Sequence, residues 1–391
     1  MSRTPNHGEY LIQWHRSITE LGQAEWDLLA LPMQTPFLEW AWLKLLEASA
    51  SASDQTGWHP VHLTVRRAGT LVGAAPLYLK WHSQGEFVFD HVWAEVAGKV
   101  GASYCPKCVG AVAFTPVSGY AFLVHPEQDV NQVTELMARA LNRMCLDNGV
   151  QSVHFHFADQ NWARRMKGFH FLSWEHQAFQ WTHEGFSSFD EYLQVFKSSQ
   201  RKNIKRERRA LQEQGITVSA LTGEQVTREA LEEMYHFYEK TNDKYAPWNC
   251  KFLNRKFFLE LGDHFRHRLL MFKAFKGGHA LVGASLLVFK GDRLFGRYWG
   301  CVEDVPHLHF NLCFYEPIAW AIKNGIHCFD PGIGAAHKVR RGFESVTAYS
   351  LHRFFDVQMQ KIFELNIGKI NEHARQQVEA LNGLLPLKRG G

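Results

Sequence analysis

The sequence predicts an α/β protein built from two tandem copies of one α/β unit, each with a mixed, mostly antiparallel sheet flanked by helices. The chain has 391 residues, a length that favours two domains over one hydrophobic core. Its content of 46% hydrophobic and 21% charged residues is typical of a globular protein. Residues 63–80, LTVRRAGTLVGAAPLYLK, and residues 270–290, LMFKAFKGGHALVGASLLVFK, share one hairpin pattern. The repeat and the shared element order around it predict the tandem arrangement.

The first half begins with a strand-like segment at residues 10–14 and a helix in which Phe37, Trp40, Leu43 and Leu46 recur at helical spacing. The hairpin at 58–80 follows, and GEFVFDHVW at 85–93 has the composition of another strand. A helix is expected at 127–148, where Asn148-Gly149 forms a stop signal, and strands are expected at 151–157 and 176–184.

The second half repeats this order. We expect a basic helix at about 190–214, a strand at 215–220, helices at 227–238 and 255–261, a hairpin at 268–290 and a strand at 293–302. A helical tail is expected at about 357–385. The predicted domains are therefore residues 1–185 and residues 186–391.

The stretch from residue 308 to 343 combines a helix, a short buried strand and a basic loop. Leu312, Tyr315, Ala319 and Ile322 lie three or four residues apart, which predicts one apolar helical stripe. Asn324-Gly325 ends the helix, and residues 326–329 form a strand closed by Asp330-Pro331-Gly332. Basic residues and glycines that follow a buried strand are typical of the functional edge of an α/β sheet. An ordinary polar surface loop is the alternative.

Composition limits the classes of function. A net charge of +4 excludes a generally polycationic nucleic-acid binder and permits a local basic patch. No apolar run approaches membrane-spanning length, and the N-terminal residues lack the apolar core of a signal peptide, so we expect a cytoplasmic protein without integral membrane association. Seven cysteines without framework spacing are expected to be reduced thiols. Cys105 and Cys108 form one CxxC pair that lacks a second ligand pair, so no metal site is predicted.

The basic helix is the strongest local charge signal. Helical spacing places Lys197, Arg201, Lys205 and Arg208 on one face. A neighbouring face carries Lys202, Arg206 and Arg209. Such a ridge either faces solvent or binds a phosphate-rich partner, because phosphates would offset the repulsion between its like charges.

Several segments together resemble the bacterial FemAB-like family. They are TPFLEWAWLKLLE, GAAPLYLKWHSQGEFVFD, AFTPVSG, SSQRKNIKRERRAL, GRYWGCVEDVPHLHFNLCFYEPIAWAI and HKVRRGF, which cover nearly the whole chain. The family is related to the Fem-type transferases, which carry two tandem GNAT-like acyltransferase domains and add amino acids from aminoacyl-tRNA to peptidoglycan precursors. The resemblance implies this fold and an N-acyltransferase or aminoacyltransferase activity.

The resemblance also implies roles for individual residues. Lys338 corresponds to a catalytic lysine that stabilises charge on the reacting acyl group. Independently of the resemblance, the incoming amine must lose a proton, which His337 or an acid such as Glu303 or Asp304 could accept. His309 is a further candidate base, with a cap-region or surface histidine as the alternative. Lys80 and Glu86, in a segment similar to the family's Lys-x-His-x-x-Gly-Glu pattern, would bind the acceptor.

Further binding residues follow from the pattern of charge and strand alternation. Arg297, Trp299 and Cys301 are expected on one face of a strand and Tyr298 on the other, where Tyr298 or Trp299 could line the acyl slot. Cys301 itself is expected to be a core thiol. Arg340 and Arg341 would bind substrate or pair with carboxylates. The residues assigned to tRNA or phosphate binding are Arg201, Lys202, Lys205 and Arg208.

One departure bears on the donor. GNAT enzymes that use acetyl-CoA hold its pyrophosphate in a glycine-rich turn at a helix start, whereas residues 300–309 read GCVEDVPHLH. This favours aminoacyl-tRNA as co-substrate, with no bound cofactor, and a small-molecule or peptide amine as acceptor. A CoA-dependent N-acetyltransferase is the alternative enzyme. A non-catalytic protein that binds a cell-wall or other anionic fragment is the alternative of a different class.

Overall fold

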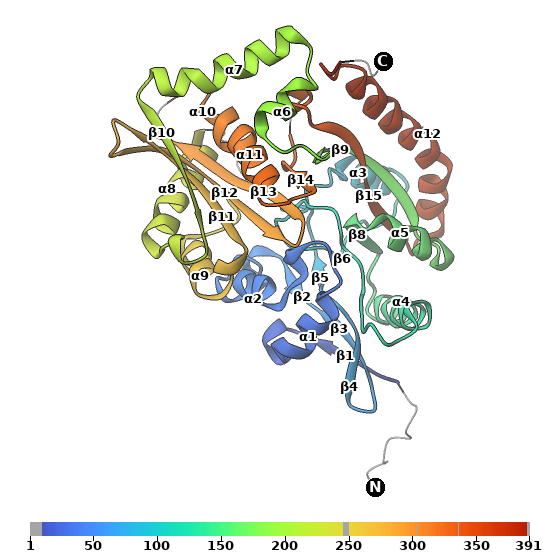
Figure 1. The fold of residues 1–391 in the computed structure, drawn as a ribbon. Helices are drawn as coiled ribbons and strands as arrows, with labels where there is room; N and C mark the ends of the chain where they lie inside the picture. Colours follow the sequence, from blue (N-terminus) through green and yellow to red (C-terminus); the bar gives the residue numbers. More distant parts are fainter. Residues whose placement is uncertain (1–9, 245–249, 303, 335, 389–391) are drawn as a thin grey trace. The chain divides into compact units, whose positions relative to one another are not determined.

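The computed structural model describes residues 10–244, 250–302, 304–334 and 336–388. The chain forms two compact units, whose helices and strands carry their labels in Figure 1. Unit 1 comprises the chain up to His176 together with Ala348–Ala374, and unit 2 comprises Gln177–Thr347 together with the residues from Arg375 onward. From the sequence we expected two consecutive domains divided at residue 185. The two units differ from this division because residues 348–374, near the C-terminal end, belong to unit 1. The return of residues 348–374 to unit 1 depends on long-range contacts, which local sequence signals do not reveal.

Unit 1 contains strands of two sheets. One sheet has the order β1-β3-β4-β7, and the unit 1 strands of the other follow the order β15-β8-β6-β5-β2. Neighbouring strands are antiparallel except β6 and β8, which are parallel. The strands are β1 (Tyr10–His15), β2 (His59–Pro60), β3 (His62–Arg67), β4 (Thr70–Ala75), β5 (Leu77–Lys80), β6 (Lys107–Gly110), β7 (Leu123–Val124), β8 (Ser152–Ala158) and, from residue 348, β15 (Glu344–Phe354). The helices are α1 (Gln23–Ala30), α2 (Trp40–Ala48), α3 (His91–Lys99), α4 (Val130–Asp147), α5 (Gln160–Met166) and the first part of α12 (Val357–Asn382).

Unit 2 is built on one set of strands in the order β10-β11-β12-β13-β14-β9, in which only β13 and β14 are parallel neighbours. The strands are β9 (Leu172–Thr182, in this unit from residue 177), β10 (Ile216–Thr222), β11 (Leu269–Lys276), β12 (Ala280–Lys290), β13 (Arg293–Cys301) and β14 (Cys328–Asp330). The helices are α6 (Phe189–Gln194), α7 (Ser198–Glu213), α8 (Arg228–Lys244), α9 (Arg255–His264), α10 (Leu308–Phe310), the π-helical turn η7 (Asn311–Tyr315), α11 (Glu316–Lys323) and the 3-10 segment η8 (Ala336–Arg341). The mixed α/β prediction is confirmed.

The two hairpins share a detail that confirms the internal repeat. In β3 and β4 the pairing passes from Val65–Gly73 to Arg66–Leu71, which leaves Val72 as an extra residue. In β11 and β12 it passes from Ala274–Gly283 to Phe275–Leu281, which leaves Val282 extra. Both β-bulges therefore fall on the valine of the Val-Gly-Ala motif.

The copies differ where the first contains a proline. β12 runs without interruption, but Pro76 separates β4 from β5, which belong to different sheets. Proline has no N–H to donate to a strand ladder, so a strand interior breaks there.

Two predicted elements were wrong in detail. Residues 85–93 do not form a strand: the chain is irregular up to Asp90, and α3 begins at His91. The expected helix at 190–214 is two helices, α6 and α7, separated by residues 195–197. Phe196 is fully buried in this interruption, so hydrophobic packing fixes a break that the charge pattern does not show.

The expected helix at residues 308–323 forms as α10, η7 and α11 in succession. Leu312 and Tyr315 are buried, Ile322 is nearly so, and Asn324 ends the helix as predicted. The π turn in the middle leaves a backbone carbonyl without its usual partner, and the buried Ser285 hydroxyl donates to the carbonyl of Leu312 at 2.7 Å. π turns are frequent at functional sites.

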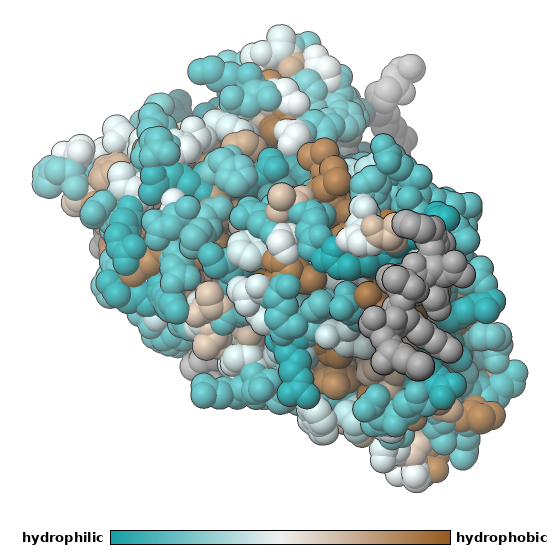
Figure 2. Space-filling view, turned by 90° about the horizontal axis from the view of Figure 1, so that it is seen from below, coloured by the Kyte–Doolittle hydropathy of each residue, from teal (hydrophilic) through white to brown (hydrophobic). Residues whose placement is uncertain are grey.

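The surface in Figure 2 is mostly hydrophilic, with apolar residues in small separate patches. Among the residues that the structure describes, no helix is both long enough and apolar enough to span a membrane.

Candidate functional site

The split between β13 and β14 is the organising feature of unit 2. The two strands pair only along Arg293–Phe295 and Cys328–Asp330. Beyond Phe295 the register of β13 shifts, so that Arg297 becomes an extra residue between Gly296 and Tyr298. After Asp330 the chain turns at Pro331-Gly332. This turn lies close to the backbone of Gly296, because a Cβ atom on Gly332 would be 3.3 Å from the carbonyl oxygen of Gly296. A β-bulge beside a strand end is a common way to shape an active site.

Lys338 reaches this split from η8. Its ammonium donates to the carbonyl oxygen of Gly332 at 2.7 Å and lies 5.4 Å from the centroid of the Phe179 ring. The residue is only 4% exposed, and burial lowers the pKa of the Lys338 amine to about 8 although the nearby Asp330 opposes the shift. Burial raises the pKa of Asp330, whose carboxylate accepts the amide proton of Gly332 at 2.7 Å. The Lys338 ammonium and the Asp330 carboxylate therefore attract each other electrostatically.

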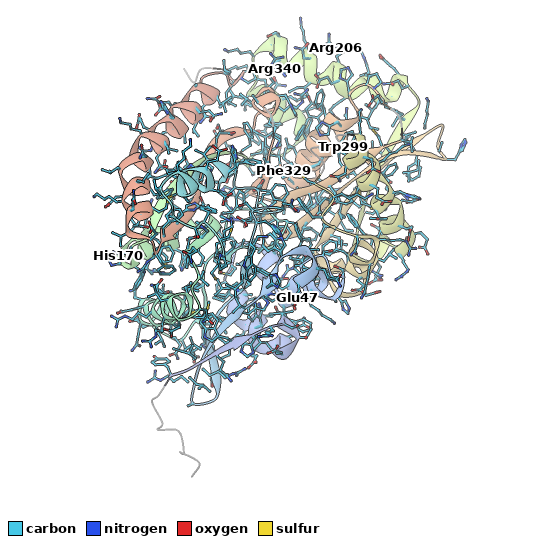
Figure 3. All side chains as sticks on the ribbon, turned by 180° about the vertical axis from the view of Figure 1, so that it is seen from behind. Glu47, His170, Arg206, Trp299, Phe329 and Arg340 are labelled. Carbon is cyan, nitrogen blue, oxygen red and sulfur yellow. The ribbon has the colours of Figure 1, made fainter. Side chains whose placement is uncertain are left out.

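A pocket of about 620 Å³ lies at the far end of β13. Trp299, labelled in Figure 3, and Cys301 both line it, as strand alternation predicted. The pocket is bounded by α8, by the end of β13, by the start of the helix at residue 308 and by η8. Its lining residues are Lys240, Thr241, Lys244, Trp299, Cys301, Val302, Asp304, Val305, His307, His309, Phe310 and His337. Two of the three predicted catalytic residues, His309 and His337, therefore lie together.

The two histidines are held as neutral imidazoles. The ring of His309 packs on Trp299 with centroids 4.5 Å apart and faces His337 at 5.9 Å. Burial, with help from the positive charges of Arg341 and Lys338, lowers the pKa of His309 to about 3. The pKa of His337 is lowered for the same reasons. The Nε2 atom of His337 is buried and finds no hydrogen-bond partner among the described residues.

Arg297 does not follow the predicted alternation. Tyr298 points away from the pocket and packs on Tyr238 and Phe258, with ring centroids 5.4 and 5.3 Å apart. The guanidinium of Arg297 donates to the Tyr298 hydroxyl at 3.3 Å instead of joining Trp299. The bulge at Arg297 adds one residue to the strand, and one extra residue reverses the side that a strand position faces. The expectation that Arg297 and Tyr298 lie on opposite faces was wrong.

Two predicted arginines have different environments. Arg340 is exposed, whereas Arg341 is buried and its guanidinium pairs with Glu207 at 3.2 Å. Arg341 therefore pairs with a carboxylate within the protein, which was one of the two alternatives. Of the two acids named as candidate bases, Glu303 lies outside the described residues and Asp304 pairs with Lys244 at 2.8 Å.

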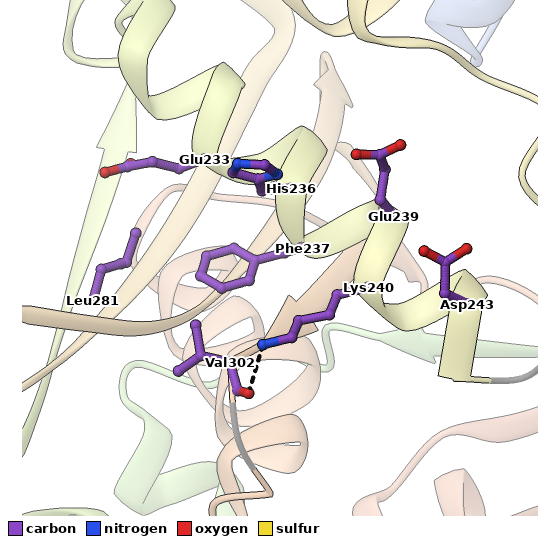
Figure 4. A pocket seen from close by; sticks show the side chains of 8 residues that line it. All are labelled: Glu233, His236, Phe237, Glu239, Lys240, Asp243, Leu281 and Val302. Atoms are coloured by element: carbon purple, nitrogen blue, oxygen red, sulfur yellow. Dashed lines mark hydrogen bonds between the residues drawn. The ribbon is translucent and has the colours of Figure 1, made fainter.

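Sequence reasoning missed the contribution of α8. Its residues Lys240, Thr241 and Lys244 line the pocket, and Lys240 also lines a second hollow of about 510 Å³ (Figure 4). The Lys240 ammonium donates to the carbonyl oxygen of Val302 at 2.9 Å. The remaining lining residues of the second hollow are Glu233, His236, Phe237, Glu239, Asp243, Leu281 and Val302. The spacing of Glu233, Phe237, Lys240 and Lys244 along one helical face was the available signal.

The outward face of α7 carries the basic ridge. Ile204 and Leu211 are its buried residues, while Lys202, Lys205, Arg206 and Arg209 are exposed. Arg201 and Arg208 are half-buried: Arg201 donates to Gln194 at 3.2 Å, and Arg208 pairs with Glu316 at 3.0 Å. Lys202 and Arg206 have no ion-pair partner within the part of the chain that the structure describes. The exposed ridge is therefore centred on Lys202 and Arg206, not on the face first expected.

In unit 1, Lys80 and Glu86 belong to a buried polar network. The Lys80 ammonium lies 3.6 Å from the Trp58 ring centroid and 3.8 Å from Glu86, and burial lowers its pKa to about 7. Lys107 donates to Ser83, Glu86 and Asp90 at 2.7, 2.9 and 2.7 Å. His156 contacts the same Glu86 oxygen at 2.9 Å.

A second part of the network is formed by histidines. His154 and His352 contact each other through their Nδ1 atoms at 2.7 Å, and Ser350 joins His352 to His176. Burial lowers the pKa of all three imidazoles, to about 3 for His176. Within the described ranges, no group of three or more His, Cys, Asp or Glu side chains is arranged to hold a metal ion.

Comparisons with known proteins agree with this architecture. The profile of the FemAB-like family, described as peptidoglycan biosynthesis/recognition, matches residues 17–389. No curated protein matches the chain. The structure of FemX is 12% identical with a TM-score of 0.53, covering 92% of this chain and 100% of FemX. A C-terminal DUF2156 domain assigned to a lysylphosphatidylglycerol synthetase from Agrobacterium fabrum is 9% identical with a TM-score of 0.55, covering 90% and 97%.

A conserved protein of unknown function from Bacteroides thetaiotaomicron shares 11% identity and a TM-score of 0.51, covering 88% of this chain and 99% of that protein. At such low identities these likenesses concern the fold alone. The match of the family profile spans nearly the whole length, including every segment on which the resemblance rested. The chain belongs to the FemAB-like family.

Proposed function

We propose that this protein transfers an acyl or aminoacyl group from an activated donor to an amine, and that the reaction takes place beside Lys338. The single observation that carries the proposal is the buried Lys338 ammonium at the β13–β14 split, with His337 adjacent in the chain. Membership of the FemAB-like family and the tandem domain architecture support it.

The chemistry follows from these side chains. The acceptor amine attacks the carbonyl carbon of the donor ester, a C–N bond forms, and negative charge develops on the carbonyl oxygen. One hydrogen of the Lys338 ammonium is donated to Gly332, so two remain for that oxygen. A fixed donor of this kind contributes about 3 kcal/mol to transition-state stabilisation. His337 accepts the amine proton through its unpartnered Nε2 and returns it to the departing oxygen as the ester C–O bond breaks.

We further propose aminoacyl-tRNA as the donor and a small-molecule or peptide amine, such as a cell-wall precursor, as the acceptor. The exposed ridge of Lys202, Lys205, Arg206 and Arg209 suits a phosphate backbone. Residues 300–309 offer no glycine turn for the pyrophosphate of CoA, which counts against acetyl-CoA. A tRNA-dependent reaction would take place in the cytoplasm. Lys80 and Glu86, expected from the sequence to bind the acceptor, are fully buried in unit 1, so they are assigned no direct contact with the acceptor.

The test uses radiolabelled mixed aminoacyl-tRNA, with a small-molecule extract as the source of acceptors. We expect transfer of label that RNase abolishes, and that Lys338→Ala reduces by about 100-fold or more. Lys323→Ala, which removes an exposed lysine of α11, is the matched control and should retain activity.

Each other outcome favours a different candidate. Transfer from labelled acetyl-CoA that resists RNase would identify the CoA-dependent enzyme. Ligand binding without turnover, unchanged in Lys338→Ala, would identify a binding protein. Undiminished turnover in Lys338→Ala would rule out the mechanism.

A further inference from the structure

Glu207 is an acid on the inward face of α7. It is half-buried, whereas Lys202, Lys205, Arg206 and Arg209 of the basic ridge are exposed. Its carboxylate accepts hydrogen bonds from the Tyr315 hydroxyl and from Arg341, the latter at 3.2 and 3.3 Å. Its backbone carbonyl accepts from the side-chain amide of Asn311 at 3.1 Å. With a side chain 12% exposed, Glu207 is held at three points by the π-turn helix and by η8.

Arg341 connects this acid to the candidate catalytic segment. One arm of its guanidinium reaches Glu207, and the other donates to the backbone carbonyl of His337 at 2.9 Å. The face of the guanidinium stacks 3.4 Å from the centroid of the Phe310 ring, and the Tyr192 hydroxyl donates to the Arg341 carbonyl at 2.8 Å. A planar guanidinium with two directed arms fixes position in a way that a lysine ammonium does not.

A second contact joins the same two elements. Gln200 lies two turns before Glu207 on the same side of α7, and its side-chain amide donates to the backbone carbonyl of Arg340 at 2.7 Å. The inward face of α7 therefore holds both arginines of η8, while the outward face carries Lys202 and Arg206 (Figure 3 labels Arg206 and Arg340). The segment that presents His337 and Lys338 has little freedom to move without α7.

We propose that Glu207 and Arg341 form a positioning pair that ties α7 to residues 337–338, fixing where the His337 imidazole and the Lys338 ammonium stand. The inference takes the roles of those two groups from the proposed function and adds the residues that orient them. Neither Glu207 nor Arg341 is required to touch the substrate. The pair acts through the His337 carbonyl and through the charge that it sets beside the imidazole.

The charges of Glu207 and Arg341 should shift the pKa of His337 in opposite directions, and this effect can be measured. Besides Arg341, the groups that face the His337 ring are Lys338 from η8, and His309, Phe310 and Phe314 from the neighbouring helix. Glu207 partly neutralises Arg341. Glu207→Gln should therefore lower the pKa of His337 further, and Arg341→Met should raise it, each by on the order of one pH unit.

The experiment labels histidine Cε1 with ¹³C and follows the His337 signal, assigned by its loss in His337→Gln, as a function of pH. Opposite shifts in Glu207→Gln and Arg341→Met support the proposal. Shifts of the same sign, or none, would overturn it, because the charges of the pair would then not act on the His337 imidazole. If Arg341→Met does not fold, Arg341→Lys replaces it: the charge stays, so the titration should change little while turnover falls.

Turnover is the second readout. Glu207→Gln should lower kcat by about 100-fold with little change in the KM for the donor, because misplacement of catalytic groups acts on the chemical step. The outward variant Lys202→Ala plus Arg206→Ala should do the reverse, raising KM and sparing kcat. Full kcat in Glu207→Gln would contradict the proposal. The NMR readout needs no turnover, so failure of the proposed reaction would not be mistaken for failure of the positioning pair.

Discussion

The ammonium of Lys338 and the carbonyl oxygen of Gly332 are 2.7 Å apart, and this contact ties the basic segment η8 to the turn that ends β14. The turn and the lysine thus meet at the point where β13 and β14 separate. A cation is thereby held at the strand ends by a short backbone contact, with Asp330 nearby to balance it.

The protonation state of Lys338 predicts a pH dependence of the reaction. Because burial lowers the pKa of its amine to about 8, the ammonium is present below that pH and is lost as the pH rises through it. The rate should therefore fall above about pH 8 in the wild type. In Lys338→Arg the guanidinium stays charged, so whatever activity remains should lack this decline. Matched pH–rate profiles of the two proteins make the comparison, and an identical decline in both would assign it to another group.

The basic ridge predicts a salt-dependent affinity for tRNA. Lys202→Ala plus Arg206→Ala should weaken binding and reduce the slope of log K against log salt concentration by about 2. Fluorescence anisotropy with labelled deacylated tRNA at several salt concentrations measures both quantities. Lys323→Ala plus Lys369→Ala removes the same charge from other exposed sites and is the control. Equal losses in the two double variants would indicate only a general charge effect.

The two lysines of the unit 1 network should differ in their contribution to stability. Lys107 makes three hydrogen bonds to Ser83, Glu86 and Asp90, and its positive charge lowers the pKa of Asp90 to about 2 in spite of burial. Lys107→Met leaves two buried carboxylates with one cation fewer and should cost about 3–5 kcal/mol.

Within the described part of the chain, Lys80 makes one hydrogen bond, to the carbonyl oxygen of Gln84, and its ammonium form is disfavoured by burial. Lys80→Met should therefore destabilise unit 1 much less than Lys107→Met does. Urea unfolding followed by tryptophan fluorescence compares the two variants. A larger loss in Lys80→Met would mean that the carboxylates depend on Lys80 instead.

The buried histidines predict loss of stability in acid. His154, His176 and His352 are neutral in the folded protein, and their lowered pKa values mean that the unfolded chain binds protons first. Stability contributed by their neutral state is complete above about pH 6.5 and falls as the pH drops below that value, by about 1.4 kcal/mol per pH unit for each histidine. His352→Gln should reduce this slope by about one histidine's share. Unfolding curves at pH 7.0 and 5.5 test it, and an unchanged slope would contradict it.

Much of the fold could be predicted because local sequence patterns indicate its helices, turns and hairpins. The apolar stripe of residues 308–323 and the Asn324-Gly325 stop identified the helix, and the Val-Gly-Ala hairpins identified the repeat. Three of the residues named from the sequence, His309, His337 and Trp299, line one pocket together with Cys301, which was expected to be a core thiol. The predicted orientation of Arg297 was wrong because a β-bulge depends on how two strands pair. The helix α8 was expected, but its contribution to the pocket was missed because its pocket residues are remote in sequence from the others.

The sequence by itself determined the family, the α/β class, the tandem repeat and the residue types of the site. Periodicity, turn signals and motif identity depend on neighbours along the chain. Only the tertiary structure decided that Glu207 neutralises Arg341, that Lys338 is buried against Gly332, and that Lys80 and Glu86 lie in a network with Lys107. These are contacts between distant segments, and burial there removes water from the charges. The tertiary structure decides which charged groups are paired or exposed, and burial shifts the pKa of those that lose water. Local sequence patterns do not reveal this burial.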